Sequence, residues 1–260
     1  MQVYFFGNSD SPLLGIYHPP VSGYGQQAVL LCYPTFNEYM RTHWAFRRLA
    51  GLLSEADCHV FRFDYFGTGD STGHGSEASV ERWKADVVSA FMELKDVSVV
   101  RKISVVGARF GAALATLAST DDLEIDKLVL WDPVVSGKNY LDELIALNNS
   151  RSHIFPKISD NRAVSELMGY PFSEVLGLQI EQTDLLSMAG QRAERIFLIS
   201  SEDKEEYRQM GHEFTYKPIS FEHHKLNETC SWQSPEGFDQ ALIVNQVLVK
   251  IRDVIAGHNQ

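Results

Sequence analysis

The sequence has little cysteine, a deficit of positive charge and no long apolar run. Its three cysteines, Cys32, Cys58 and Cys230, are an odd number without the paired spacing of a metal site. Cys32 and Cys58 lie in apolar segments, so we expect reduced thiols in the core. Lysine and arginine number 23 against 34 aspartate and glutamate residues, which gives a net charge of −11. This balance argues against a general nucleic-acid binder and against binding to anionic membrane surfaces.

Targeting and membrane signals are also missing from the sequence. The start, MQVYFFGNSD, lacks a basic region followed by a long apolar stretch, and no later run approaches the roughly 20 apolar residues of a membrane-spanning helix. Hydrophobic residues make up 44% of the 260 residues and charged residues 22%, so the chain can bury a sizeable core. We therefore expect a soluble, cytoplasmic protein without membrane insertion.

Short apolar runs along the chain predict a mostly parallel β-sheet. The segments Gln2–Phe6 and Leu13–His18 alternate in hydrophobicity and are separated by turn-forming residues, so they predict an antiparallel hairpin. Strands buried on both faces are predicted at Ala28–Tyr33, Cys58–Phe63, Lys102–Gly107, Lys127–Asp132, Arg195–Ser200 and, more weakly, Lys217–Glu222.

Helical spacing fills most of the gaps between these strands. Ala78–Lys95 has apolar residues at intervals of three and four, with Ser79 as the predicted N-cap. Phe238–Gly257 has the same spacing and ends in glycine, so it predicts a terminal helix. Strands alternating with helices imply right-handed crossovers and a parallel sheet.

The alternation stops between Pro133 and Gln191. No strand is expected there, only short amphipathic pieces around residues 140–147, 163–168 and 174–180. An insertion of this kind between strands usually packs over the carboxyl edge of the sheet as a lid. We therefore expect one α/β domain over residues 1–260, with a helical cap at about residues 133–191.

The segment KISVVGARFGAALATLA, Lys102 to Ala118, has the order of strand, sharp turn and helix that carries the nucleophile in G-x-S-x-G. Gly107 and Gly111 suit a strained turn that leaves no room for side chains. The nucleophile position holds Arg109, whose guanidinium stays protonated and has no lone pair for attack on a carbonyl. The motif therefore predicts a nucleophile turn without a nucleophile. The alternative is a chance match in which Arg109 points to solvent.

Two further segments fit the same fold. FRFDYFGTGDSTG, Phe61 to Gly73, is similar to the D-x-R-G-x-G-x-S segment after the fourth strand of many α/β-hydrolases, with Phe66 in place of the arginine. The segment after the third predicted strand takes the place of an oxyanion-hole loop. A backbone N–H near Thr35 or Phe36, together with that of Phe110, would form the two-donor cradle.

These segments, with YPTFNEYMR, WDPVVSGKNYL and CSWQSPEGF, make the chain resemble the α/β-hydrolase superfamily in its serine-aminopeptidase-like branch. Within that branch it looks like the hydrolase-like proteins associated with bacterial exosortase systems. The resemblance implies an α/β-hydrolase fold, and for function it implies a role in polysaccharide or secretion-linked metabolism. The name hydrolase describes the fold of those relatives, and it says nothing about the chemistry of this site.

A catalytic triad in this fold needs an acid and then a histidine after the nucleophile. Asp203, with Glu202 beside it, follows the penultimate strand and is the predicted acid, although an exposed acidic turn explains it equally well. His223 and His224 lie in the last strand and point opposite ways, so at most one faces the site. Trp232 stands nearer the final helix, where such enzymes often place the base.

Arg109 needs an anionic neighbour, because its charge meets the positive end of the helix dipole. Two internal partners are available: Glu38, or the acidic pair Glu202 and Asp203, either of which would form a structural ion pair. The external partner is a ligand carboxylate or phosphate, held by the guanidinium and by helix N–H groups. Four aromatic cap residues either line a pocket or belong to the cap core: Tyr140, Phe155, Tyr170 and Phe172.

The leading functional prediction is a hydrolase-like protein with a degenerate triad that lacks serine hydrolase activity. It would bind a small anionic or glycan-like ligand, or a partner protein, and it needs no metal or cofactor. The predicted binding residues are Arg109, Phe110, Asn37, Glu38, Asp203 and Trp232.

Two alternatives stay open. One is an active esterase, thioesterase or peptidase. Its nucleophile would be Ser71, Ser136 or Ser231, or its water would be activated by His224 or His223, with Asp203 as the acid. The other is a scaffold whose old site is closed by an ion pair.

Overall fold

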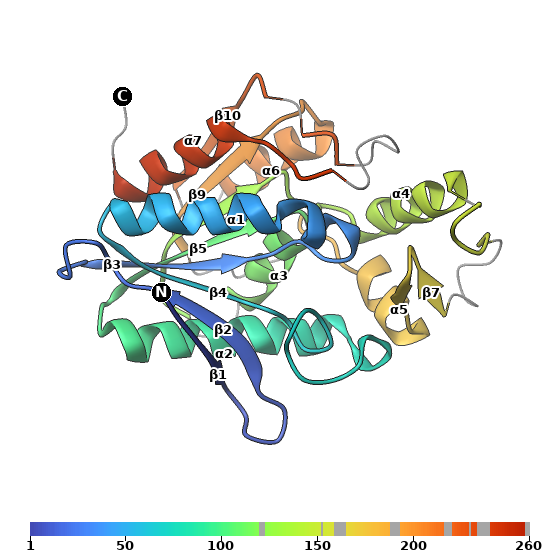
Figure 1. The fold of residues 1–260 in the computed structure, drawn as a ribbon. Helices are drawn as coiled ribbons and strands as arrows, with labels where there is room; N and C mark the ends of the chain where they lie inside the picture. Colours follow the sequence, from blue (N-terminus) through green and yellow to red (C-terminus); the bar gives the residue numbers. More distant parts are fainter. Residues whose placement is uncertain are drawn as a thin grey trace.

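The computed structural model describes residues 1–119, 123–151, 153–158, 165–187, 193–215, 220–228, 230–232 and 240–257. Within these residues, eight strands form one sheet in the order β1-β2-β4-β3-β5-β6-β9-β10 (Figure 1). The strands are β1 Gln2–Phe6, β2 Leu13–His18, β3 Gln27–Cys32, β4 Cys58–Phe63, β5 Lys102–Ala108, β6 Ile125–Trp131, β9 Ala193–Ser200 and β10 Ser220–Lys225.

The strand directions match the predicted mostly parallel sheet. β1 pairs with β2 and β2 with β4 in antiparallel register, and all further pairs across the sheet are parallel. The last strand continues past the predicted end at Glu222, since its register with β9 runs from Ser220 opposite Arg195 to Lys225 opposite Ser200. The predicted residues 217–219 lie outside the described part of the chain.

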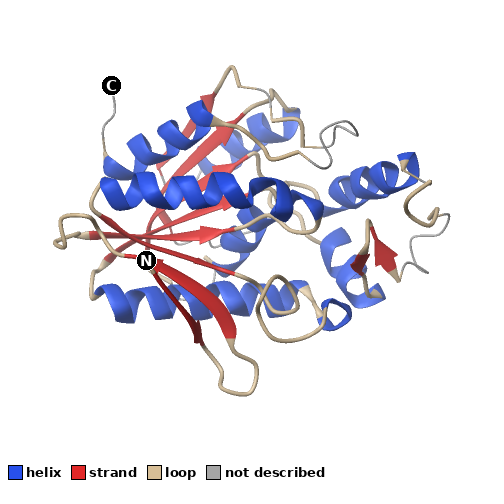
Figure 2. Ribbon diagram, viewed as in Figure 1, coloured by secondary structure: helices blue, strands red, loops and turns tan. Residues whose placement is uncertain are grey.

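Helices lie on both faces of this sheet, as Figure 2 shows. They are α1 Asn37–Glu55, α2 Val80–Ser98, α3 Phe110–Ala118, α6 Glu205–Thr215 and α7 Asn245–Ala256. α1 contacts α7, and α2 contacts α3. The Ser79 hydroxyl caps α2 as predicted, by accepting the backbone N–H of Arg82 at 3.1 Å.

The terminal helix is shorter than the prediction from Phe238. It begins at Asn245, because residues 240–244 run as non-helical chain along α1, where the N–H of Leu242 donates to the carbonyl of Arg41 at 2.8 Å. Residues 238 and 239 lie outside the described ranges. The predicted glycine end is confirmed, since Gly257 takes the left-handed conformation directly after α7.

The segment between β6 and β9 contains α4 Gly137–Ser150, β7 Glu166–Leu167, β8 Tyr170–Pro171 and α5 Glu174–Glu181. We call these elements the cap, and Figure 1 shows them beyond the carboxyl ends of the strands. The helices at 140–147 and 174–180 were predicted. The expectation that no strand occurs here is wrong, since β7 and β8 form a hairpin across Met168 and Gly169. Both turn residues have positive φ, and strands of two residues leave no alternation to detect.

Backbone strain gathers at the carboxyl ends of three neighbouring strands. Phe36 follows β3 with φ 56°, Arg109 follows β5 with φ 52°, and Asp132 follows β6 with φ 41°. Such conformations in residues other than glycine cost about 1–3 kcal/mol each and concentrate at functional sites. Ligands of open α/β sheets also bind at this edge. The candidate site therefore lies where β3, β5 and β6 end under the cap.

Candidate active site

The turn at Arg109 has the tight geometry of a nucleophile elbow. Arg109 takes φ 52° and ψ −122° directly before α3. A Cβ added to Gly107 would lie 2.6 Å from the Cα of Ala112, and one added to Gly111 would lie 2.1 Å from the carbonyl oxygen of Tyr33. Both positions therefore require glycine. The alternative in which Arg109 points to solvent is wrong, because only 2% of this residue is exposed.

The guanidinium of Arg109 is engaged inside the protein. Its Nε lies 2.9 Å from Oε1 of Glu38, one Nη lies 3.4 Å from the carbonyl oxygen of Asp132, and the other lies 3.5 Å from the partly exposed carboxylate of Glu143. The rings of Tyr140 and Trp232 flank it, each with its centroid 5.5 Å from the guanidinium carbon. The internal ion pair with Glu38 was one of the predicted roles for Arg109.

Glu38 is the counter-charge of this pair, and 0% of it is exposed. Burial raises the pKa of the Glu38 carboxyl, and Arg109 and the hydroxyl of Tyr140 act against that rise. Burial alone would lower the pKa of Arg109, but the Glu38 carboxylate outweighs it and raises that pKa. A guanidinium does not lose its proton in proteins, so the two side chains form a buried ion pair.

Tyr140 fastens the cap to this pair. Its hydroxyl donates to Oε2 of Glu38 at 3.0 Å and lies 3.4 Å from the hydroxyl of Thr35. Its ring stacks on Phe110, with centroids 5.6 Å apart and planes 6° apart. The predicted binding residue Phe110 is therefore buried against α4. The first turns of α1 and α3 and the cap helix α4 meet at the ion pair.

Asp132 and Trp232 form a second buried contact at the elbow. The Trp232 indole N–H donates to Oδ2 of Asp132 at 2.8 Å, and Asp132 also accepts the backbone N–H and the hydroxyl of Ser201 at 2.8 and 2.7 Å. In a triad, a carboxylate holds the N–H of the base, and the base contacts the nucleophile. Trp232 has this relation to Asp132 and Arg109. Its indole N–H is a donor only and cannot take up a proton.

Asp132 was not among the predicted site residues. The signal was the dipeptide Trp-Asp at the end of a buried strand, which places a carboxylate at the carboxyl edge of the sheet. We expected the acid one strand later, after β9, where the resemblance places it.

The structure does not bring the predicted acid Asp203 to the elbow. Asp203 lies at the surface, with 43% of its side chain exposed, and pairs with Arg208 at 2.9 Å and Lys225 at 3.7 Å. A hydrogen bond from Arg208 holds the pKa of the Asp203 carboxyl below its usual value. Its neighbour Glu202 lies 3.5 Å from Lys204. These contacts fit the exposed acidic turn that was the alternative interpretation.

The two histidines of β10 point opposite ways, as predicted. Nε2 of His223 lies 2.8 Å from the hydroxyl of Ser200, and the ring of His224 stacks on Phe197 at 6.3 Å. Burial lowers the pKa of both imidazoles. None of the contacts of these histidines with described residues is with Arg109. A group of three or more metal-ligating side chains is not found in the described ranges either.

The candidate alternative nucleophiles have structural partners. The Ser71 hydroxyl donates to the carbonyl of Asp64 at 2.6 Å, and the Ser136 hydroxyl caps α4 by accepting the N–H of Asn139 at 3.3 Å. Ser231 offers its carbonyl oxygen to Arg41 at 2.8 Å. These contacts hold turns and helix ends, and none of them is with a histidine.

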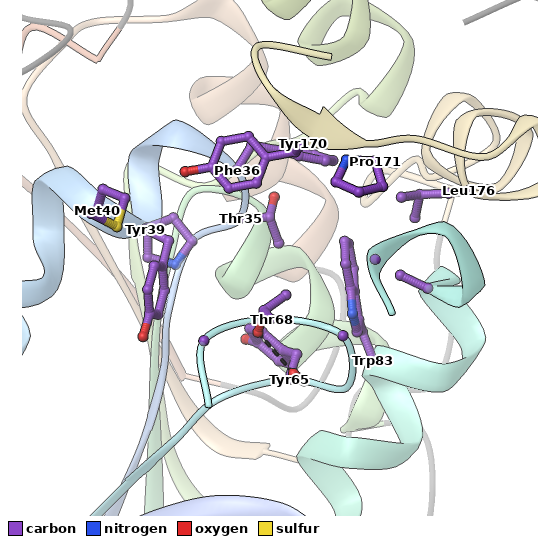
Figure 3. Close-up of a pocket in the computed structure, with 15 residues that line it drawn as sticks. Thr35, Phe36, Tyr39, Met40, Tyr65, Thr68, Trp83, Tyr170, Pro171 and Leu176 are labelled. Carbon is purple, nitrogen blue, oxygen red and sulfur yellow. Dashed lines mark hydrogen bonds between the residues drawn. The ribbon is translucent and has the colours of Figure 1, made fainter. Parts of the chain in front are cut away.

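A cavity of about 260 Å³ lies between the cap and the loops that follow β3 and β4. We call it the aromatic pocket. It is lined by Pro34, Thr35, Phe36, Tyr39, Met40, Tyr65, Gly67, Thr68, Gly69, Gly75, Ala78, Trp83, Tyr170, Pro171 and Leu176. In Figure 3, Tyr170, Pro171 and Leu176 from the cap lie across the space from Tyr65 and Thr68.

The ion pair does not line this pocket. Thr35 does line it. The Thr35 hydroxyl contacts the hydroxyl of Tyr140, which donates to Glu38, so these two residues connect the pocket with the ion pair. Of the cap aromatics, Tyr170 lines the pocket, Tyr140 and Phe172 are buried, and Phe155 packs partly against the core. The elbow is therefore filled by the protein's own side chains, and the open space lies beside it.

Asn37 begins α1 next to the ion pair and is 3% exposed. Both its amide nitrogen and its amide oxygen are buried without a hydrogen-bond partner among the described residues. Asn37 and Glu38 are thus the first two residues of a helix, and they do not form a loop as the oxyanion-hole interpretation implied.

Comparisons with known proteins agree with this fold. Residues 26–192, more than half of the chain, match the model of the serine aminopeptidase S33 family. The chain is 38% identical over 94 residues to the alpha/beta hydrolase domain-containing protein aho-3 of Caenorhabditis elegans, and this match spans about a quarter (26%) of that relative.

Solved structures are similar over nearly the whole length. Alpha/beta hydrolase domain-containing protein 10 from mouse matches with a TM-score of 0.63 and 15% identity over 100% of both chains. The bottromycin epimerase BotH in complex with bottromycin A2 matches with a TM-score of 0.61 and 16% identity over 99% of both chains. At these identities the likeness concerns the fold, which is the α/β-hydrolase fold expected from the sequence.

Proposed function

The chain belongs to the serine aminopeptidase S33 family of α/β-hydrolase-like proteins, and from this premise we propose that it binds a small ligand without serine hydrolase chemistry. The observation that carries the proposal is the buried ion pair between Arg109 and Glu38 at the elbow. An arginine held in this way has no lone pair for attack on a carbonyl.

The position of the base supports the same proposal. Trp232 makes the contact with Asp132 that a catalytic histidine makes with its acid, and an indole cannot accept the proton of a nucleophile. A triad without its nucleophile retains only about 10³–10⁴-fold catalysis over water from the oxyanion hole and binding. Activation of a different serine would need a base beside it, and the contacts of Ser71 and Ser136 are structural.

The aromatic pocket is the proposed ligand site. Its lining is dominated by aromatic and aliphatic side chains with few polar groups, which is the usual composition of small-molecule sites. We therefore propose a small ligand with an apolar body. The anionic ligand predicted from Arg109 is less well supported, because Glu38 already neutralises that guanidinium. The BotH structure gives a precedent for a protein of this fold that is not named a hydrolase, since it is called an epimerase.

A scaffold with a closed site is the second candidate function, and the ion pair between Arg109 and Glu38 favours it. The nearer relation to exosortase-associated proteins, the single-domain organisation and the cytoplasmic location stay proposals from the sequence. The described helices include none that is long and apolar enough to cross a membrane.

The test of lost serine chemistry is labelling of the purified protein with a fluorophosphonate probe, read by intact mass. A serine esterase is the positive control, and hydrolysis of a 4-nitrophenyl ester is measured beside it. We expect neither an adduct nor turnover above the buffer rate. One stoichiometric adduct would refute the proposal, and peptide mapping would identify the nucleophile.

The test of the pocket is binding of 4-phenylbutan-2-one, followed by ligand-observed NMR. Met40 lies at the pocket and is 67% exposed, so Met40→Trp narrows the pocket without disturbing the core. Met92→Trp, at an exposed position on α2, is the matched control. We expect the protein and the control to bind the ketone and Met40→Trp to bind it at least fivefold more weakly. Absence of binding to the unmodified protein would favour the scaffold.

A further inference from the structure

A second cavity adjoins the aromatic pocket and has a different chemical character. Its volume is about 410 Å³, and we call it the polar cavity. It is lined by Asn37, Met40, Arg41, Met168, Tyr170, Gln240 and Ala241. Met40 and Tyr170 line both cavities, so the two spaces share a wall at these side chains.

Asn37 is the unexplained group of the polar cavity. Both polar atoms of its amide are buried without a hydrogen-bond partner among the described residues. A buried amide that makes no hydrogen bond costs free energy, so nearly all such groups in proteins are paired with protein atoms, water or a ligand. The Asn37 nitrogen offers two donors and its oxygen accepts, so a single ligand group that satisfies both atoms carries an acceptor and a donor side by side.

Arg41 sets the polarity on one side of Asn37. It is 5% exposed, and its three hydrogen bonds to described residues go to neutral carbonyl oxygens, those of Ser231, Trp232 and Gln240. Glu38 is the carboxylate that acts on Arg41 through space, and it is already bonded to Arg109 and Tyr140. The Arg41 charge therefore favours an acceptor oxygen in the polar cavity.

A carboxylate fits this place less well than a carboxamide. It has no donor for the Asn37 oxygen, and its charge would add to the net charge of −11 of the whole protein. A carboxamide oxygen accepts from Asn37 beside Arg41, and its N–H donates back to the Asn37 oxygen. The reciprocal pair satisfies both atoms of Asn37.

We infer that the ligand is a small carboxamide with an aromatic or other apolar body, the body in the aromatic pocket and the amide paired with Asn37 in the polar cavity. This inference rests on the proposed ligand-binding function and names the ligand class. Asn37 is its specificity-determining residue.

The experiment compares three probes with the same phenylethyl body by isothermal titration calorimetry. 3-Phenylpropanamide has a donor and an acceptor, 4-phenylbutan-2-one of the same shape has only the acceptor, and 3-phenylpropanoate is charged. We expect the amide to bind at least tenfold more tightly than the ketone and than the carboxylate. In Asn37→Leu, which keeps the side-chain size, the amide should lose more affinity than the ketone, so that the two affinities come within about twofold.

The outcomes separate this inference from the proposed function. If the ketone binds and the amide binds no more tightly, water satisfies Asn37, and the inference is wrong while the ligand site stands. Equal losses for all three probes in Asn37→Leu would mean a structural role and would also overturn it. If no probe binds the unmodified protein, the ligand site itself fails and the inference with it. Should Asn37→Leu not fold, Asn37→Ala, which removes both the donor and the acceptor and suits a helix, must also lose the preference for the amide.

Discussion

Replacement of Arg109 by methionine tests how much the buried ion pair contributes to the fold. Methionine keeps the unbranched shape and leaves the strained backbone at φ 52° as it is, so the substitution removes mainly the charge. Glu38 would then remain fully buried, with the hydroxyl of Tyr140 at 3.0 Å as its one remaining partner among the contacts described above. Removal of one member of a buried pair costs about 3–5 kcal/mol.

The loss of unfolding free energy predicts a shift in melting temperature that depends on the size of the chain. In proteins of 150–250 residues each kcal/mol shifts Tm by roughly 2–4 °C, so we expect Arg109→Met to melt about 6–20 °C lower. The companion Arg109→Met/Glu38→Leu removes both charges. Since apolar replacement of a whole buried pair is often neutral, this double variant should recover most of the loss. The double-mutant cycle, measured by urea unfolding with tryptophan fluorescence, gives the coupling free energy.

The stability deficit of Arg109→Met should depend on pH in a defined direction. Burial raises the pKa of the Glu38 carboxyl, and loss of Arg109 removes the main influence that opposes the rise. A carboxyl with a raised folded pKa supplies stability that is present below its unfolded pKa of about 4.3 and is lost as the pH rises. The deficit of Arg109→Met should therefore be larger at pH 8 than at pH 5.

The control is Lys138→Met, which breaks an exposed pair with Asp142 and should leave Tm unchanged within error. A deficit of Arg109→Met below about 1 kcal/mol at pH 8, against the expected 3–5 kcal/mol, would refute the reasoning that the pair holds α1, α3 and α4 together.

Three further outcomes follow. Arg109→Ser alone should give no fluorophosphonate adduct by intact mass, whereas Arg109→Ser/Trp232→His should give one, because the second change supplies a base beside the buried acid; labelling of the single variant would contradict this. Burial raises the pKa of Asp86 to about 6. As the pH rises from 4 to 6, the free energy of unfolding of the unmodified protein should therefore fall relative to that of Asp86→Asn by up to about 3 kcal/mol. Equal changes in the two proteins, measured by urea unfolding, would contradict this. Gly111→Ala should lower stability by about 1–3 kcal/mol or more from overpacking, whereas Gly51→Ala, in open space on α1, should raise it slightly in thermal melts.

The sequence predicted the elbow because its constraint is local. A buried strand, two glycines four residues apart and a helix of small residues leave one sharp turn as the solution, and Arg109 falls at its apex. The internal partner of Arg109 could be narrowed from the sequence only to two places. Glu38 lies 71 residues away in the sequence, and the choice between it and Asp203 depends on how α1 enters the site.

The start of α1 shows why the sequence left that choice open. Asn37 and Glu38 were interpreted as loop residues, because the segment follows a strand where an oxyanion loop is expected. The buried residues Ala45, Leu49 and Leu53 recur at intervals of four and indicate a helix, which begins at Asn37 without a side-chain cap. Strain at Phe36, with φ 56°, turns the chain into that helix and carries Glu38 inward.

Asp132 and Trp232 could not be paired from the sequence, because they lie 100 residues apart and neither belongs to a motif that names the other. The resemblance also directed attention to the acid after β9. The cap hairpin was missed for a different reason: β7 and β8 have two residues each, below the length at which alternation is visible.

The geometry also says why a single substitution should not return hydrolysis under the proposed function. A serine at position 109 would lie beside the Glu38 carboxylate, which would have lost its counter-charge, and beside an indole that accepts no proton. The space for a ligand lies on the far side of Thr35 and Tyr140 from this position, along the aromatic pocket and the polar cavity. The proposed ligand site and the elbow are thus connected through Thr35, which lines the aromatic pocket and contacts Tyr140. A ligand can occupy the cavities without meeting Arg109, so the same ion pair that fills the elbow leaves the pocket open.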